Sequence, residues 1–491
     1  MRGQSTTPPS TADVAVIGAG AAGLYAAVCA SREGARVVLI SRTPLAGSAS
    51  YWAQGGIAAA LAEGDSPERH LEDTLRAGRG ASRPSAARVL VEDSPERVRD
   101  LEQLGVHFDA DRHGALALGL EGGHSERRVV HAGGSATGRR ITRELSALVA
   151  TDDRIEVLES STASAIWRAD GRCVGAVAER PGGGLTPVLA RGTVIATGGA
   201  AALWERTTNP RGVIGAGLTL AAHAGAALAD LEFVQFHPTA LRVDGEHDGF
   251  LITEAVRGEG ALLLDGTGER FVDELAPRDE VALAVQTRRS AGEDVRLDMR
   301  EIDMTHFPNV AAQLERAGID PRRDLVPVAP AAHYTMGGIA TGIEAGSTVP
   351  GLFAVGECAC NGLHGANRLA SNSLAECFVF GRRAALAALD CEPPPGDPGA
   401  PPESGPDPVP PRPTRAALWR SAGLRRNPDD LSRLAETDPF PLARKIARSA
   451  LAREESRGAH QRVDHPETDP ALDLTHSVIA GDEPARFERW E

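Results

Sequence analysis

The chain has 491 residues, 42% of them hydrophobic, and a formal net charge of −15 at pH 7. This length exceeds what one hydrophobic core supports, so we expect two or three domains. The acidic balance excludes an extended nucleic-acid or anionic-membrane surface, because both require clustered Lys and Arg. No apolar run approaches the roughly 20 residues of a membrane helix, and the six cysteines lack disulfide or zinc spacing. We therefore expect a soluble, cytoplasmic protein with no metal site.

The N-terminal part predicts a strand, a glycine turn, a helix and a second strand. An apolar strand at 13–17 runs into Gly18-x-Gly20-x-x-Gly23, and another follows at 36–40. The first glycine permits a tight turn, the second lets the backbone approach a pyrophosphate, and the third lets the helix pack on the strand. An ordinary glycine turn is the alternative, which the strand and helix context disfavours. The predicted dinucleotide-binding residues here are Gly18, Ala19, Gly20, Ala21, Ala22 and Gly23.

The segment after the second strand distinguishes between dinucleotides. An acidic residue usually binds the NAD ribose here, but this strand ends in Ser41-Arg42. Ala53-Gln54-Gly55-Gly56 resembles a segment of the flavoproteins of the fumarate reductase and succinate dehydrogenase group, which implies FAD. Members that attach FAD covalently have a histidine five positions before the glutamine, where this chain has Ala49. The resemblance therefore implies noncovalent FAD.

The resemblance extends the predicted FAD site to the later parts of the chain. Glu357 resembles the acidic residue that binds the ribityl chain, and Ser373-Leu374 resembles the turn beneath the flavin ring. The further residues that we expect at FAD are Arg42, Ala49, Ser50, Tyr51, Trp52, Ala53, Gln54, Gly55, Gly56, Thr162, Ala163, Glu357, Ser373 and Leu374.

The remaining patterns predict an α/β fold of several domains. Residues 86–104 have the pattern of an amphipathic helix, and the segments 192–199 and 351–357 each read as a buried strand ending in a glycine turn. Prolines recur through 393–413, a composition typical of extended linkers. Helical composition follows at 414–424 and 440–457. We predict a Rossmann-like FAD-binding domain (12–230 and 331–390), an inserted α+β capping domain (231–330), a Pro-rich linker (391–413) and a short helical C-terminal domain (414–491).

Five segments combine His, Arg and Glu in a way that no core requirement explains. They occur in an order similar to that of the L-aspartate oxidase family, and the resemblance extends from about residue 13 to residue 381. The segments are Glu121-Gly-Gly-His124, Gln235-Phe-His237-Pro-Thr239, Leu275-Ala-Pro-Arg278-Asp279, Ala331-Ala-His333-Tyr-Thr335 and His364-Gly-Ala-Asn-Arg368.

The family resemblance implies how these residues hold a dicarboxylate. Arg368 and His333, with His237 and Thr253, would bind the two carboxylates, and Arg278 would transfer a proton at the reacting carbons. A planar guanidinium binds a carboxylate through two charge-assisted hydrogen bonds, so two arginines suit a dianion. Taken singly, such histidines and arginines are more often structural, but their joint occurrence favours a site. His124 and Glu254 lie beside the matched positions.

Glu121 favours aspartate over succinate as the substrate. A carboxylate near a dianion is repulsive, whereas the ammonium of aspartate reverses the sign of the interaction. The resemblance implies oxidation of L-aspartate to iminoaspartate, with O₂ (giving hydrogen peroxide) or fumarate as the acceptor. It also implies that quinolinate synthase uses the product, in NAD biosynthesis.

Two alternatives remain open at the level of sequence. One is a soluble fumarate reductase or succinate dehydrogenase-type flavoprotein. The other is a flavin-binding protein without catalysis, since the family's G-D-G segment reads Gly215-Ala216-Gly217 and the C-terminal helical region is short by about one helix.

Overall fold

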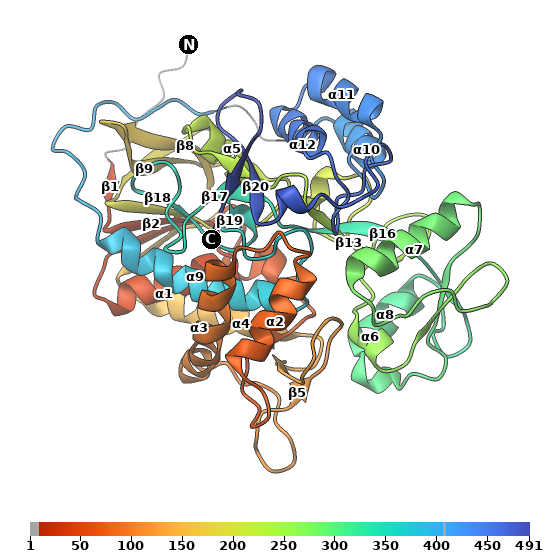
Figure 1. The fold of residues 1–491 in the computed structure, drawn as a ribbon. Coiled ribbons are helices and arrows are strands. Elements are labelled where there is room, and N and C mark those ends of the chain that lie inside the picture. The colour runs from red at the N-terminus through yellow and green to blue at the C-terminus, as the bar shows by residue number, and fades with distance from the viewer. Residues whose placement is uncertain (1–8, 406–408) are drawn as a thin grey trace.

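The computed structural model describes residues 9–405 and 409–491. Its centre is a parallel sheet with the strand order β18-β11-β2-β3-β7 (Figure 1). The short strands of this sheet are almost entirely apolar because helices or a second sheet cover both faces. Along β2, Val14 and Val16 belong to the core on one side, whereas Ala15 and Ile17 belong to the core on the other. The strand bounds are β2 (Val14–Ile17), β3 (Val37–Ile40), β7 (Ile155–Leu158), β11 (Gly192–Ile195) and β18 (Leu352–Ala354).

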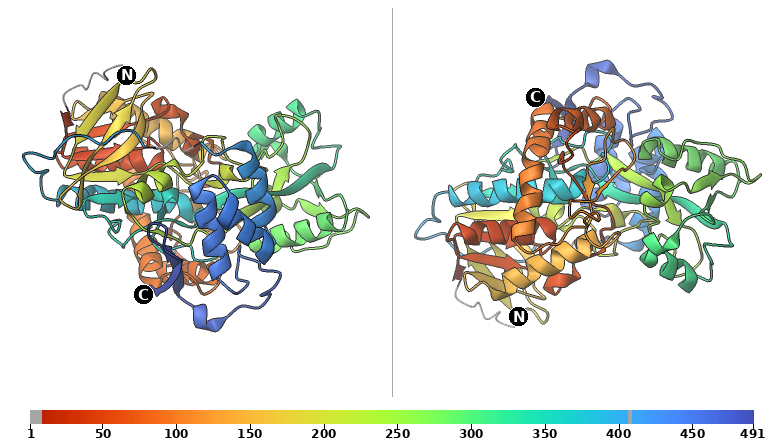
Figure 2. Two further views of the ribbon diagram at one scale, coloured as in Figure 1. Left: turned by 90° about the horizontal axis from the view of Figure 1, so that it is seen from above. Right: turned by 90° about the horizontal axis from the view of Figure 1, so that it is seen from below.

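Helices cover one face of this parallel sheet (Figure 2). The helix α1 (Ala21–Arg32) packs against α9 (Asn372–Leu389) and α4 (Thr137–Thr151), and α3 (Pro84–Gln103) packs against α9 and α2 (Pro67–Ala77). The amphipathic helix that the sequence predicts at 86–104 is α3. The opposite face carries a sheet with the order β1-β10-β9-β8, made by Ser10–Thr11, Leu185–Leu189, Arg172–Glu179 and Thr162–Ala169.

The capping domain projects from the body as an α+β unit with its own core (Figure 1). Its sheet has the order β13-β16-β15-β14, and the long strands β13 and β16 connect it to the body. Apolar side chains of its strands and helices form a buried cluster that includes Leu263, Val281, Leu297 and Val310. Its elements are β13 (Val234–Leu241), α6 (Ala255–Gly258), β14 (Leu262–Leu264), α7 (Arg278–Ser290), β15 (Arg296–Asp298), η4 (Met304–His306), α8 (Pro308–Arg316) and β16 (Val326–Thr335).

The C-terminal part contains helices and a β-hairpin. The helices are α10 (Arg412–Ser421), α11 (Pro428–Thr437) and α12 (Pro441–Ala452), followed by η6 (Pro470–Leu472). The helical segments that the sequence predicts at 414–424 and 440–457 correspond to α10 and α12. The hairpin joins the body, because its strand β20 pairs with β12 in the sheet β19-β17-β12-β20-β21, formed by Ala359–Cys360, Gly338–Ala340, Leu228–Ala229, Thr475–Ile479 and Arg486–Arg489.

Shorter elements complete the body. A small sheet, β4-β6-β5 (Ile57–Ala58, Val129–Val130 and Leu118–Gly119), flanks the loop that contains Glu121. Between α9 and α10, the described residues form neither helix nor strand, and 406–408 of the expected linker lie outside the described residues. Within the described residues, no helix has both the length and the apolarity needed to cross a membrane. The remaining short elements are α5 (Ala216–His223), η1 (Leu45–Gly47), η2 (Ala49–Trp52), η3 (Ala201–Leu203) and η5 (Gly356–Cys358).

Candidate active site

A cavity of about 1440 Å³ extends from the carboxyl ends of the parallel strands to the base of the capping domain. The turns after β2, β3, β11 and β18 line it, as expected for an α/β sheet that binds its ligand at these strand ends. Pockets for drug-sized ligands usually occupy about 300–1,000 Å³, so this cavity has room for a dinucleotide and a small substrate.

The glycine turn between β2 and α1 leaves no room for a side chain at Gly18 or Gly23. Gly18 has φ +108°, and a Cβ there would lie 2.4 Å from the carbonyl oxygen of Ala196. A Cβ on Gly23 would lie 1.9 Å from the carbonyl oxygen of Gly18, so this glycine allows the helix to pack against its own turn. Gly20 precedes α1 and lines the cavity, so the first backbone N–H groups of the helix lie at the cavity wall. Such a helix start favours a pyrophosphate.

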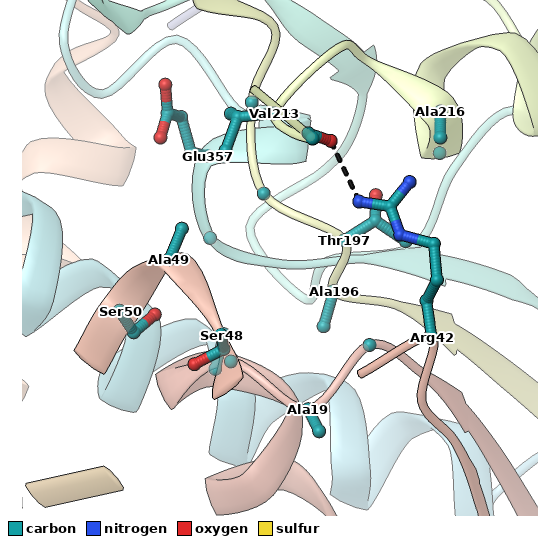
Figure 3. A pocket seen from close by; sticks show the side chains of 18 of the residues that line it. Ala19, Arg42, Ser48, Ala49, Ser50, Ala196, Thr197, Val213, Ala216 and Glu357 are labelled. Carbon is teal, nitrogen blue, oxygen red and sulfur yellow. Dashed lines mark hydrogen bonds between the residues drawn. The ribbon is translucent and has the colours of Figure 1, made fainter. Parts of the chain in front are cut away.

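Polar groups on the cavity wall fit the rest of FAD. The side-chain atoms Ser48 Oγ, Gln54 Oε1 and Thr197 Oγ1 are buried and have no partner within the part of the chain that the structure describes, and their residues line the cavity. Buried polar atoms are normally hydrogen-bonded, so these three atoms indicate a hydroxyl-rich or amide-rich ligand. Arg42 reaches across the cavity and donates a 2.9 Å hydrogen bond to the carbonyl oxygen of Gly212, with Ala216 nearby (Figure 3). The residues present therefore fit FAD.

Glu357 is a half-buried residue in η5, directly after β18, and it lines the cavity (Figure 3). Its Oε1 accepts hydrogen bonds from the backbone N–H of Thr335 at 2.9 Å and from the Thr335 hydroxyl at 3.3 Å. Burial raises the pKa of Glu357 to about 7, although these bonds and the charge of Arg368 oppose the shift. Glu357 therefore changes charge near neutral pH when the cavity holds no ligand.

Two arginines share one acceptor at the end of the cavity nearest the capping domain. Arg278, the first residue of α7, and Arg368, from the body, each donate a 3.1 Å hydrogen bond to Gln235 Oε1. Arg278 also donates to Glu254 Oε2 at 2.6 Å, and Arg368 donates to Ser373 Oγ at 3.1 Å. Nε of Arg368 is buried without a partner among the described residues. This concentration of positive charge suits a dianionic ligand.

Two histidines lie beside these arginines. His237 on β13 and His333 on β16 face each other with ring centroids 5.1 Å apart. Burial and the nearby charge of Arg278 hold the pKa of both imidazoles well below its usual range. Both rings are therefore neutral at physiological pH, and each can donate one hydrogen bond to a carboxylate. Thr208 shares a 2.8 Å hydrogen bond with Nδ1 of His333 and so orients that ring.

Glu121 places a negative charge in the same cavity. Its Oε2 accepts a 2.6 Å hydrogen bond from Ser371, and His131 Nε2 lies 3.6 Å from its Oε1. Burial opposes ionisation, but the contact with His131 and the bond from Ser371 lower the pKa of Glu121 to about 2. At this end of the cavity, Glu121 therefore adds a buried carboxylate to the pair of Arg278 with Glu254 and to the guanidinium of Arg368.

Most of the residues that the sequence predicts for the site line this one cavity. Thr253 and the five charged or imidazole residues of the substrate group all do so, as do Thr162 and Ala163 of β8. Gly23 and Tyr51 lie outside the lining: Gly23 packs against the glycine turn, and Tyr51 contacts Trp52 edge to face. His124 lies outside the lining too, whereas Glu254 belongs to it.

Sequence reasoning assigned no role to several residues that contribute to the cavity. Gln235 stands in a quoted motif, but its position between two arginines depends on the packing of the capping domain. Ser371 lies two residues before the predicted Ser373-Leu374 turn. The polar run Ser371-Asn372-Ser373 could have indicated that Ser371 also belongs to the site. Residues 402–405 of the Pro-rich linker also line the cavity, which linker composition alone does not indicate.

Comparison with family models and relatives identifies the family of this chain. Residues 13–374 match a family model described as an FAD binding domain, and residues 419–489 match one described as the fumarate reductase flavoprotein C-terminal domain. An L-aspartate oxidase of Caulobacter vibrioides is 44% identical over 499 residues, which cover 96% of each chain. One of Nostoc is 49% identical over 396 residues, covering 77% of this chain and 68% of the relative. The chain belongs to the L-aspartate oxidase family. Members of this family are flavin-dependent oxidoreductases, and this chain is such an enzyme.

Solved structures place the L-aspartate oxidase fold beside that of the fumarate reductases. A quinol-fumarate reductase with menaquinol molecules is 30% identical, with a TM-score of 0.89 over 99% of this chain and 98% of the other. A quinol fumarate reductase of E. coli gives a TM-score of 0.86 at 30% identity, covering 99% and 97%. The Rossmann-like domain, the inserted capping domain and the C-terminal domain that the sequence predicts are therefore confirmed as the fold class.

Proposed function

We propose that this enzyme oxidises L-aspartate to iminoaspartate with noncovalently bound FAD. The carrying observation is the charge pattern of the cavity, where Arg278 and Arg368 share Gln235 and Glu121 is ionised close by. The charge of Arg278 is paired with Glu254, so the guanidinium of Arg368 and the neighbouring histidines match the two carboxylates. The carboxylate of Glu121 matches one ammonium. Succinate has no group for Glu121, whereas L-aspartate has one.

The residues would act on aspartate as follows. Arg368 and the neutral imidazoles of His237 and His333 bind the carboxylates, and Thr253 adds a hydroxyl. Glu121 accepts a hydrogen bond from the ammonium and orients the Cα–H bond. When bound, FAD would take up a hydride, that is two electrons and one proton, from Cα, while a second proton leaves the substrate nitrogen. O₂ (forming hydrogen peroxide) or fumarate would then take up the two electrons and two protons. The glycine turn, the unpartnered wall atoms and Glu357 would hold that cofactor.

Arg278 would serve the reaction in which fumarate is the acceptor. Its guanidinium donates to Glu254 Oε2 and Gln235 Oε1, so its orientation is fixed from two sides. Reduction of fumarate requires that a proton be delivered to a carbon atom of the substrate. Arg278 lines the cavity in which this transfer would take place. The likeness to quinol-fumarate reductases supports fumarate as an acceptor.

We also place the enzyme in the cytoplasm and its product upstream of quinolinate synthase, in NAD biosynthesis. All six cysteines are free thiols, which suits a reducing compartment. The membership of the L-aspartate oxidase family supports the metabolic assignment.

Anaerobic mixing tests the choice of substrate directly. In two separate anaerobic experiments, FAD-loaded protein is mixed with L-aspartate or with succinate. The absorbance band of the oxidised flavin is followed in each. We expect aspartate to bleach the band and succinate to leave it largely unchanged. Rapid bleaching by succinate alone would assign the protein to the succinate dehydrogenase type, and no bleaching by either would favour a protein without catalysis.

A further inference from the structure

Arg79 connects the body to the capping domain outside the cavity lining. It lies directly after α2, in the turn formed by residues 78–81. Its guanidinium donates two hydrogen bonds to Asp279 in helix α7 of the capping domain. Nε lies 3.0 Å from Oδ2, and Nη2 lies 3.2 Å from Oδ1. Nη2 also donates to Glu280, the next residue of the helix. Two parallel, charge-assisted hydrogen bonds between a guanidinium and a carboxylate are stronger than neutral ones and fix the relative orientation of the two groups.

The contact lies next to the arginine that the reaction needs. Asp279 follows Arg278 in the chain, and its side chain is only 6% exposed. Burial raises the pKa of Asp279, although the charge of Arg79 opposes that shift. Without Arg79, this carboxylate would remain largely buried without its cation, which is unfavourable while the cap stays in place. The body therefore stabilises the position of α7 at the end that begins with Arg278.

The turn of Arg79 is also fixed on the side of Arg368. The backbone N–H of Ala366 donates a 3.1 Å hydrogen bond to the carbonyl oxygen of Gly78, so the turn adjoins the segment that contains Arg368. Arg79 itself has φ +57°, a left-handed conformation that is uncommon for a residue with a side chain.

The C-terminal part supports the same turn from behind. Arg457 donates a 2.6 Å hydrogen bond from Nη1 to the carbonyl oxygen of Arg79. Arg457 is itself held by Glu455, through Nε to Oε1 at 2.9 Å and Nη2 to Oε2 at 3.0 Å. The body, the capping domain and the C-terminal part thus meet at this one turn.

We propose that Arg79 is a positioning residue that holds the capping domain closed, so that Arg278 and Arg368 face the same substrate. The role of the two arginines rests on the proposed function. The ion pair between Arg79 and Asp279, which we call the latch, does not depend on it. If only the closed form binds substrate, then opening the latch lowers the fraction of competent enzyme and weakens apparent binding. Saturating substrate restores closure, so turnover at saturation is preserved.

The test compares Arg79→Ala, Arg79→Lys and the control Arg300→Ala. The control removes an arginine whose ion pair with Asp298 lies within the capping domain and does not bridge to the body. We expect Arg79→Ala to raise KM for L-aspartate about tenfold and to keep kcat within about twofold, because the closed fraction falls to about a tenth. FAD content should match the native protein. Arg79→Lys should recover part of the loss, and Arg300→Ala should behave as native.

Hydrogen exchange gives a readout that does not depend on the substrate. The amides of residues 278–290 should exchange faster in Arg79→Ala and in Asp279→Asn, which breaks the same pair from the other side. The double variant should exchange no faster than Arg79→Ala, which already removes the contacts with both Asp279 and Glu280. Unchanged exchange in α7 would overturn the latch, as would a loss of kcat at unchanged KM. Faster exchange in a protein that does not oxidise aspartate would keep the latch and reject the proposed function.

Discussion

The hydroxyl group of Ser371 donates a 2.6 Å hydrogen bond to Oε2 of Glu121. The same hydroxyl oxygen accepts a 3.1 Å hydrogen bond from the backbone N–H of Gly56, in the segment Ala53-Gln54-Gly55-Gly56. One hydroxyl thus connects the carboxylate that we assign to the substrate ammonium with the segment that we assign to FAD. This arrangement orients Glu121 without neutralising it, since a hydroxyl carries no charge.

Replacing Glu121 with Gln should affect the amino acid and spare the plain dicarboxylate. The change keeps the size of the side chain and removes the charge, so aspartate oxidation should weaken by about 2 to 5 kcal/mol, typical for a desolvated charge pair. Steady-state kcat/KM for aspartate and for fumarate reduction measure the contrast. Glu126→Gln is the control, because Glu126 is an exposed partner of Arg69. Equal losses for both ligands would make Glu121 a support of its loop.

Arg368→Lys should raise KM for aspartate by at least about tenfold, or roughly 1.4 kcal/mol. Lysine keeps the charge but cannot place two parallel donors on a carboxylate, and it loses the stacking of the guanidinium 4.6 Å from the ring centre of Tyr334. Arg383→Lys is the matched control on α9, since Arg383 pairs with Glu344 and Asp93 away from the cavity. Unchanged KM and kcat in Arg368→Lys would remove Arg368 from the binding site.

Arg278→Leu should reduce fumarate reduction by a factor of about 10² to 10⁴, the usual contribution of a positioned proton donor. Arg288→Leu changes the same residue type on the same helix at a more exposed position, where it pairs with Glu293 and Asp265. Anaerobic turnover of fumarate with a reduced dye measures both variants. Normal fumarate turnover in Arg278→Leu would exclude this guanidinium from proton transfer.

FAD should separate from the protein on acid or heat precipitation. The position that has a histidine in members with covalent FAD is Ala49, whose methyl group on η2 offers no nucleophile (Figure 3). The flavin absorbance of the supernatant and of the washed pellet measures the separation. A pellet that stays yellow after repeated washing would contradict noncovalent binding.

The stability of the FAD-free protein should depend on Glu357 as pH changes. Its pKa is about 7 in the folded chain and about 4.5 for a glutamate exposed to water, so the folded form binds more protons between these values. Stability conferred by the protonated carboxyl is complete below about pH 4.5 and is lost as pH rises toward 7, by about 3 kcal/mol. Glu357→Gln should therefore exceed the native protein in stability at pH 8 and match it near pH 4.5. Denaturant unfolding at the two pH values checks this, and a pH-independent difference would contradict it.

The local parts of the fold could be predicted because their signals lie in short segments. The glycine turn at Gly18 and the strands at 192–195 and 352–354 follow from glycine geometry and continuous apolar runs. The hairpin of β20 and β21 could not be predicted in this way, because β20 pairs with residues 228–229, far away in the sequence. Helix α11 was not predicted, although Asn427 caps its start and Leu431, Leu434 and Ala435 form an apolar face at helical spacing.

In the candidate site, the residue types could be predicted from the sequence but their placement could not. Residue types such as Arg278 and His333 could be named from motifs, since the chemistry of a dicarboxylate requires them. Their mutual placement depends on contacts between distant segments, such as the shared acceptor Gln235, 133 positions from Arg368. The wall formed by residues 402–405 follows from the path of the linker over β8, where the backbone N–H of Gly405 donates to the carbonyl oxygen of Ser164 at 2.9 Å.

The pairing of β20 with β12 also orders events during synthesis of the chain. Glu232 lies at the entry to the capping domain, buried and bonded to Ser477 at 2.6 Å, a residue made 245 positions later. Asp230 likewise meets His476. A nascent chain that has not yet reached β20 therefore has two acidic groups at the entry to β13 without these partners. The hairpin of β20 and β21 must therefore be synthesised before Asp230 and Glu232, at the entry to the capping domain, can form these hydrogen bonds.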